Sequence, residues 1–409
     1  MSVDVAKLIK KLEQEKVAGI ILDLRRNPGG SLEEAIRFSG LFVKGGPIVL
    51  ARSPEGRVSV DTDDDPGALY DGPLVVLVNR YSASASEIAA AALQDYGRAL
   101  VVGDTSTFGK GTVQNLDQLL PFARPATESP TNDPGTVKIT IRKFYRITGA
   151  STQFKGVVPD IILPDTLSYR TDANSERTLE NALPFDTLSR DEIQQVNYTK
   201  LNLVQPHLAL LHERSDARVA TNQDFIYIRQ DIAELKKLQG DKPIDEVHNR
   251  LPDTGRTQSV EPGGVATLNE REALQEREKI AAQNRARDEE RAARTAPDET
   301  IYELTVENAD DPGLPPPLEV TNTLAATGLP ATGHNQVAPA VTSGPDSKFT
   351  NSFETNAATL ATNSLSSAAA KKKPVPAIDP MLDETENILE DYISMLSKSN
   401  MLIASHPDL

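Results

Sequence analysis

The first 165 residues alternate short, continuous apolar runs with amphipathic segments, and this alternation constrains the fold more than any other feature of the sequence. Residues 31–43 and 85–96 have apolar side chains at helical spacing. Strands that are apolar on both faces lie in sheets covered on both sides, and such sheets are mainly parallel. The pattern therefore predicts an α/β domain built from βα units. The predicted strands are Val17–Leu24, Pro47–Ala51, Pro73–Val78, Ala99–Val102 and Val137–Tyr145.

The character of the chain changes after about residue 166. Up to about residue 296 it is charged and helical in pattern, most clearly in Asp224–Gln239 and Asn269–Thr295. Asp310–Pro376 has too few large apolar side chains to offset the entropy lost on folding, so we expect a disordered linker. Leu382–Ser397 has the pattern of an amphipathic helix that docks on the helical domain. The predicted parts are an α/β core (1–165), a helical domain (166–305), a low-complexity linker (306–378) and a C-terminal helix (379–405).

Composition excludes several classes of function. The net charge is −16, which argues against nucleic acid as the main partner, because phosphate binding needs a basic face. There is no cysteine, so neither a disulfide nor a thiolate nucleophile can form. No apolar run approaches the roughly 20 residues that span a bilayer, so no integral membrane segment is expected. Residues 1–16 have the pattern of an amphipathic helix and lack the apolar core of a signal peptide.

The positions of the histidines narrow the chemistry further. All five lie beyond residue 200, and the α/β region contains none. A Ser-His-Asp triad within that domain is therefore excluded. If the domain hydrolyses peptides without a metal, its base must be a lysine or a carboxylate.

The segment Tyr81-Ser-Ala-Ser-Ala-Ser-Glu-Ile88 follows a predicted strand and opens a predicted helix. Small residues on both sides of Ser84 allow a substrate carbonyl to approach, and the N–H groups of a helix N-terminus can stabilise an oxyanion. Ser84 to Glu87 also fits the capping box S-x-x-E, which many helices without catalytic function carry. Taken alone, the segment is consistent with either role.

The segment Thr107-Phe-Gly-Lys-Gly-Thr-Val-Gln114 brackets Lys110 with two glycines, which allow its backbone to approach another element closely. A lysine can act as a base only when it is neutral. Lowering its pKa from about 10.4 to roughly 7–8 requires about 4 kcal/mol of differential desolvation. Gln114 lies four residues further on, on the same side of a helix or strand, where its amide oxygen can orient the amine. A lysine on an exposed glycine turn is the alternative interpretation.

A third segment, Leu24-Arg-Arg-Asn-Pro-Gly-Gly30, lies between a strand end and a helix start. Its paired glycines suit a turn whose N–H groups point outward and bind an anion. An ordinary strand-to-helix turn accounts for it equally well.

In their order along the chain, Leu24–Gly30, Tyr81–Ile88 and Thr107–Gln114, these three segments resemble the tail-specific (C-terminal processing) family of Ser–Lys peptidases from bacteria and chloroplasts. Three short segments resemble the closing strands of that family's core: Phe144–Arg146, Gly149–Gln153 and Gly156–Ile161. Asn181–Phe185 and Leu382–Asn387 resemble the helical C-terminal domain of its larger, periplasmic members. The resemblance covers roughly residues 1–300 and 379–397.

The resemblance assigns roles to individual residues. Ser84 matches the nucleophile, Lys110 the general base and Gln114 the residue that positions the lysine. The N–H groups of Ala85 and of Gly30 or Gly29 match the oxyanion hole. The loop before Lys110 is one residue longer than is usual in the family, so the serine–lysine spacing is 26 residues.

Two acidic residues also have counterparts in the family. Asp95 matches an aspartate that the family counts as important. It lies eleven residues beyond the nucleophile, about 16 Å along a helix, so we expect a structural role for it. Glu87, one turn from Ser84, is close enough to cap the helix or to act in the site.

The resemblance also implies a crotonase-like core, a periplasmic location and catalysis without metal or cofactor. The implied substrates are proteins with unstructured, apolar C-terminal tails, and an adaptor lipoprotein is a possible partner. Members of this type carry a peptide-binding PDZ domain upstream, and none precedes Met1. The expectation is therefore a fragment, and an impaired fragment that acts only as a scaffold or binding module is the main alternative.

Two further alternatives belong to other classes. The stretch from Ala99 to Thr112 resembles a phosphate-binding loop, but five residues instead of four separate Gly103 from Gly109, and Gly111 stands where a metal-binding Ser or Thr is needed. The acidic stretch 61–65 would suit a metal, although a solvated turn is the simpler account of it.

Overall fold

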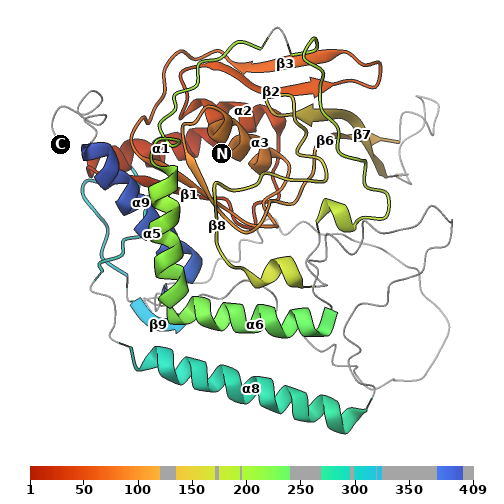
Figure 1. The fold of residues 1–409 in the computed structure, drawn as a ribbon. Coiled ribbons are helices and arrows are strands. Elements are labelled where there is room, and N and C mark those ends of the chain that lie inside the picture. The colour runs from red at the N-terminus through yellow and green to blue at the C-terminus, as the bar shows by residue number, and fades with distance from the viewer. Residues whose placement is uncertain are drawn as a thin grey trace, which may run out of the picture. The chain divides into compact units, whose positions relative to one another are not determined.

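The computed structural model describes residues 1–119, 135–170, 175–193, 196–239, 269–294, 299–318, 320–324 and 375–398 (Figure 1). The chain divides into two compact units. The first comprises Met1–Ala282, Glu303–Pro315 and Asp379–Leu409, and the second comprises Gln283–Tyr302 and Pro316–Ile378. The candidate site lies entirely in the first unit.

A four-stranded parallel sheet forms the centre of the first unit. Its order is β1 (Ile20–Asp23), β4 (Leu74–Val78), β5 (Leu100–Gly103) and β8 (Ile161–Ile162). All three neighbouring pairs are parallel. The expected α/β domain with a parallel sheet is thereby confirmed.

Both faces of this sheet are covered, which explains the continuous apolar runs. Alternate residues of β4 enter two different hydrophobic clusters: Val76 and its neighbours at positions 74 and 78 join one, and Val75 and Leu77 join the other. The first cluster is formed with α1 (Ser2–Gln14), α2 (Leu32–Gly40) and α3 (Ala85–Asp95). The second is formed with α5 (Leu208–Thr221) and α9 (Pro380–Lys398). The helices predicted at 31–43 and 85–96 are present as α2 and α3.

A second four-stranded sheet is antiparallel throughout, in the order β3 (Val58–Asp63), β2 (Gly46–Arg52), β7 (Thr136–Tyr145) and β6 (Thr112–Gln118). The predicted strands at 47–51 and 137–145 therefore exist, but they lie outside the parallel sheet. Only five residues join β2 to β3, and a parallel crossover needs a dozen or more. β3 and β6 were not predicted, because polar residues interrupt both.

Between residues 166 and 239, the described part of the predicted helical domain contains two short 3₁₀ helices, η1 (Thr166–Tyr169) and η2 (Glu176–Thr178), followed by α5 and α6 (Gln223–Gln239). The predicted C-terminal helix is present as α9 and packs against α5, β4 and β1. Arg218 of α5 forms ion pairs with Glu384 at 2.9 Å and Asp391 at 2.7 Å, which fix α9 on α5.

Three elements lie wholly or partly in the second unit. The predicted helix at 269–295 is present as α8 (Glu270–Ala292), which begins in the first unit and ends in the second. β9 (Val320–Leu324) and β10 (Val375–Ile378) pair in parallel. Both strands lie within the predicted linker (306–378), and residues 325–374 of that linker lie outside the described residues.

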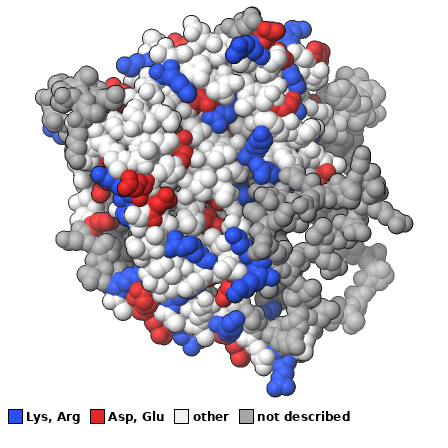
Figure 2. Space-filling view, in the orientation of Figure 1, with Lys and Arg blue, Asp and Glu red and all other residues white. Residues whose placement is uncertain are grey.

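Charges are mixed on the face of the molecule shown in Figure 2. Lys and Arg side chains alternate with Asp and Glu side chains in small groups, and among the described residues on that face we find no broad patch of one sign. A search of the described residues for helices long and apolar enough to cross a membrane finds none.

Candidate active site

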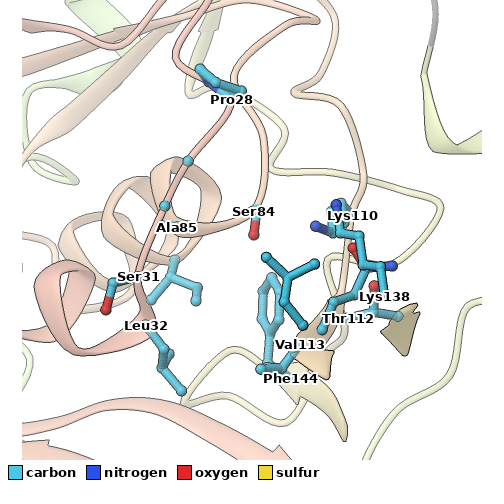
Figure 3. A pocket seen from close by; sticks show the side chains of 15 residues that line it. Pro28, Ser31, Leu32, Ser84, Ala85, Lys110, Thr112, Val113, Lys138 and Phe144 are labelled. Atoms are coloured by element: carbon cyan, nitrogen blue, oxygen red, sulfur yellow. The ribbon is translucent and has the colours of Figure 1, made fainter. Parts of the chain in front are cut away.

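A pocket of about 480 Å³ opens where the N-terminal ends of α2 and α3 face β6 and β7 (Figure 3). Six of the residues singled out from the sequence line it: Gly29, Gly30, Ser84, Ala85, Lys110 and Gln114. Five apolar side chains form much of the remaining wall: Leu32, Ile88, Val113, Leu116 and Phe144. The fold thus brings together residues from three separate segments of the sequence.

Ser84 occupies the turn between β4 and α3 in a strained backbone conformation. Its φ is 57° and its ψ is −114°, a sparsely populated region for a residue with a side chain. Two neighbouring serines hold the turn: the Ser82 hydroxyl donates to the Leu24 carbonyl at 2.8 Å, and the Ser86 hydroxyl donates to the Asn27 carbonyl at 3.0 Å. Both bonds tie the turn to the Leu24–Gly30 segment. Figure 3 shows the Ser84 side chain on the pocket wall.

Gly29 lies against this turn so closely that a side chain is excluded. Its φ is +89°, and a Cβ at this position would lie 2.5 Å from the Ala83 carbonyl oxygen and 2.6 Å from the Ala85 nitrogen. The Gly29 N–H donates to the Asn27 side chain at 3.0 Å. The N–H groups of Gly30 and Ala85 have no hydrogen-bond partner among the described residues. Of the two glycines considered from the sequence, Gly30 is therefore the one with a free donor.

Glu87 is fully buried and joins the turn that contains Ser84 to the loop that contains Lys110. Its carboxylate accepts hydrogen bonds from the N–H groups of Ser84 at 2.7 Å, Gly109 at 2.7 Å and Lys110 at 2.9 Å. It also accepts one from the Thr107 hydroxyl at 2.6 Å. Burial raises the pKa of Glu87 to about 7, and the four donors limit that rise. Glu87 therefore both caps α3 and connects the two candidate catalytic segments.

Lys110 is half-buried, and its bracketing glycines are required by packing. A Cβ at Gly111 would lie 2.5 Å from the Gln153 nitrogen, and Gly109 has a φ of +94°. Burial lowers the pKa of Lys110, and the positive charge of Lys138 lowers it further. No hydrogen bond joins Ser84 Oγ to Lys110 Nζ in the part of the chain that the structure describes, although both side chains line the same pocket.

Gln114 lies at the pocket, and its amide faces a residue other than the lysine. The side-chain amide donates to the Thr140 hydroxyl at 3.4 Å. The register between β6 and β7 shifts between Val113 and Gln114, so simple counting from Lys110 does not fix where Gln114 points. The positioning role assigned to Gln114 stays a prediction.

Asp95 lies away from the pocket, at the C-terminal end of α3. It is buried and forms a bidentate ion pair with Arg146, at 2.5 Å and 3.0 Å. Burial raises the pKa of Asp95, and Arg146 counteracts the rise. The geometry supports the structural role expected from the sequence, since the pair ties the end of α3 to the residue after β7.

Sequence reasoning missed two contributors to the site. Thr107 donates to Glu87 and also accepts from the Val157 N–H at 2.7 Å. Lys138 lines the pocket from β7. Neither position has a local signal, because both depend on contacts between segments that are distant in the sequence.

The described residues contain no group of three His, Cys, Asp or Glu side chains that could hold a metal ion. The acidic stretch 61–65, considered from the sequence, forms no such group.

Comparison with known families shows which proteins two parts of the chain resemble. Residues 1–163 match the model of peptidase family S41. Residues 169–245 match the model described as the C-terminal domain of tail-specific protease. The α/β core is therefore similar to peptidase family S41, and the region that follows it is similar to the C-terminal domain of tail-specific proteases.

Individual relatives show the same similarity. The tail-specific protease of Haemophilus influenzae is 41% identical over 229 residues, which cover 56% of this chain and 32% of the relative. A carboxy-terminal-processing protease of Bartonella bacilliformis is 39% identical over 158 residues, covering 38% of this chain and 33% of the relative. The chain thus spans about a third of the length of these relatives. A solved photosystem II D1 C-terminal processing protease has 31% identity over 40% of this chain and 39% of its own, with a TM-score of 0.34.

Proposed function

We propose that this chain is a serine endopeptidase in which Ser84 is the nucleophile and Lys110 the general base. One observation carries the proposal: a single pocket holds a strained serine, two unpartnered N–H groups and a half-buried lysine. The similarity of residues 1–163 to peptidase family S41 supports the reaction class.

The proposed reaction begins with neutral Lys110. Its amine accepts the proton of the Ser84 hydroxyl while Oγ attacks the carbonyl carbon of the scissile peptide. The N–H groups of Gly30 and Ala85 donate to the oxygen that becomes negative, and each such donor is typically worth about 3–4 kcal/mol. Lys110 then transfers its proton to the departing amine, and an acyl-enzyme remains. Water, deprotonated by Lys110, hydrolyses that ester and restores the serine.

Two features of the site support these roles for Ser84 and Lys110. Burial and the neighbouring Lys138 both disfavour the charged form of Lys110, which raises the fraction of neutral amine. Glu87 accepts hydrogen bonds from the backbone of both Ser84 and Lys110, so it holds nucleophile and base at a fixed relative position. Glu87 is in this account a positioning residue.

The proposed substrates are proteins with unstructured, apolar C-terminal tails. The apolar wall of the pocket supports apolar residues in the substrate. One relative is named a tail-specific protease and another a carboxy-terminal-processing protease, which supports cleavage near a C-terminus. A periplasmic location and an adaptor lipoprotein complete the proposal, and these rest on the family resemblance.

A serine-directed acylating probe tests the proposal. We expect a fluorophosphonate to label the chain once, at Ser84 by peptide mass mapping, and the Ser84→Ala variant to remain unlabelled. Labelling that survives in Ser84→Ala contradicts the assignment. A folded chain that binds an apolar tail peptide but takes no label supports instead the scaffold alternative.

A further inference from the structure

The charged side chains of the described pocket wall are all basic. Two ammonium groups line it, those of Lys110 and Lys138, and no Asp or Glu side chain among the described residues does. Two carboxylates act on the charge of Lys110, and both already have hydrogen-bond partners: Glu87 accepts four hydrogen bonds, and Glu176 accepts from the Gln153 amide at 2.8 Å. The pocket is therefore cationic and otherwise apolar.

The hairpin of β6 and β7 positions Lys138 at the pocket. Lys138 pairs directly with Leu116, and Thr140 pairs with Gln114, so these four side chains share the face of the hairpin that borders the pocket. Figure 3 shows Lys138 beside Lys110 at one side of the pocket, with Leu32 on the other side.

The ammonium group of Lys138 is available to a ligand. The side chain is exposed, and it forms no ion pair or side-chain hydrogen bond with any described residue. In the proposed reaction Lys110 is neutral when catalysis starts, so Lys138 supplies the fixed positive charge of the pocket.

We propose that Lys138 is a specificity-determining residue that binds a carboxylate of the substrate while the apolar wall takes the neighbouring side chains. This inference rests on the proposed peptidase function. The carboxylate is either an Asp or Glu side chain near the scissile bond or the C-terminal carboxylate of the tail. A substrate with Lys or Arg at the same place is disfavoured by repulsion.

Equilibrium binding to the Ser84→Ala chain tests the inference without turnover. Fluorescence anisotropy measures the binding of ten-residue apolar peptides, which are compared in pairs. In one set of pairs a single position carries Glu in one peptide and Gln in the other, and each position is tested in turn. In a further pair the C-terminus is free in one peptide and amidated in the other. We expect one pair to favour the carboxylate about twofold to fivefold, the range of an exposed ion pair, and to lose this preference at high salt. Which pair responds identifies the source of the carboxylate.

Three second-site variants locate the effect. Lys138→Met keeps the length of the side chain and should bring the preference to about one, and Lys138→Glu should invert it and favour a Lys-containing peptide. Lys44→Glu is the matched control, because Lys44 is exposed, does not line the pocket and gives the same change in net charge. It should leave the preference intact.

Several outcomes overturn the inference: no pair favours a carboxylate, the preference survives in both Lys138 variants, or Lys44→Glu removes it as fully as Lys138→Glu. Probe labelling of the unmodified chain separates the two proposals. If Ser84 is labelled but no carboxylate preference exists, the role of Lys138 is wrong and the peptidase stands. If no peptide binds and no label is taken, both are wrong.

Discussion

Gly29→Ala is the substitution for which the structure gives the sharpest expectation. At a φ of +89° an alanine costs about 1–3 kcal/mol in backbone strain. Its Cβ would also lie 2.5 Å from the Ala83 oxygen and 2.6 Å from the Ala85 nitrogen, and both are backbone atoms that cannot rotate away. Displacing them costs about 1–3 kcal/mol more, as overpacked cores do. We therefore expect a loss of roughly 2–6 kcal/mol in the free energy of unfolding of the first unit.

The same displacement moves Ser84, the proposed nucleophile. Ala83 and Ala85 flank Ser84, so a shift of either redirects its hydroxyl, and a misplacement of about 1 Å can cost about 10²-fold in rate. We expect Gly29→Ala to slow labelling by the fluorophosphonate by about that factor, even under conditions where the variant is folded.

Gly30→Ala is the matched control for stability. A Cβ at Gly30 meets no atom within 4 Å, so we expect a change of less than about 1 kcal/mol. The chain has no tryptophan, so urea unfolding is followed by far-ultraviolet circular dichroism. If Gly29→Ala unfolds at the urea concentration of the parent chain and takes the probe at the parent rate, the contact between the two turns does not position Ser84.

Four further predictions concern the charged groups. Activity should rise with pH on a limb that follows deprotonation of Lys110, below the ordinary lysine value of about 10.4, and Lys110→Arg should be inactive because guanidinium stays protonated. The positive charge of Lys138 is, next to burial, the second cause that lowers the pKa of Lys110. Lys138→Met removes this charge, so the rise of activity with pH should move to higher pH. A pH–rate profile whose midpoint is unchanged or lower contradicts this. Glu87→Gln places an amide NH₂ against backbone N–H donors and should reduce kcat at least tenfold. A kcat equal to that of the parent chain would show that the hydrogen bonds that Glu87 accepts from the Ser84 and Lys110 backbone are dispensable. Asp95→Asn weakens the buried ion pair with Arg146 and should lower the free energy of unfolding, measured in urea, by about 2 kcal/mol. The folded variant should still react with the probe. Loss of labelling without loss of stability would assign Asp95 to the chemistry.

The sequence predicts the part of the fold that local patterns determine. β4 is recognisable because a strand buried on both faces must be apolar at every position, and α3 because its apolar positions recur at helical spacing. The assignment of β2 and β7 to a separate antiparallel sheet could not be predicted from apolar runs alone, because sheet membership depends on pairing between distant segments.

The candidate site likewise contains residues that local sequence patterns reveal and residues that they do not. Ser84, Lys110 and the paired glycines stand out because each needs a particular neighbour type: small residues, bracketing glycines or a helix start. Lys138 and Thr107 carry no such signal. Lys138 reaches the pocket only through the register of β6 with β7, and Thr107 only through the burial of Glu87. Such contacts become visible only in three dimensions.

Cleavage of an unfolded protein with an apolar C-terminal tail tests the central claim most directly. The chain is compared with its Ser84→Ala, Lys110→Ala, Ser82→Ala and Ser86→Ala variants, with the fold of each verified by circular dichroism. We predict that loss of the nucleophile or of the base abolishes cleavage, since the two act as one unit. The two flanking serines only brace the turn, so their variants should keep measurable activity. Full activity in Ser84→Ala would show that another group attacks the peptide bond.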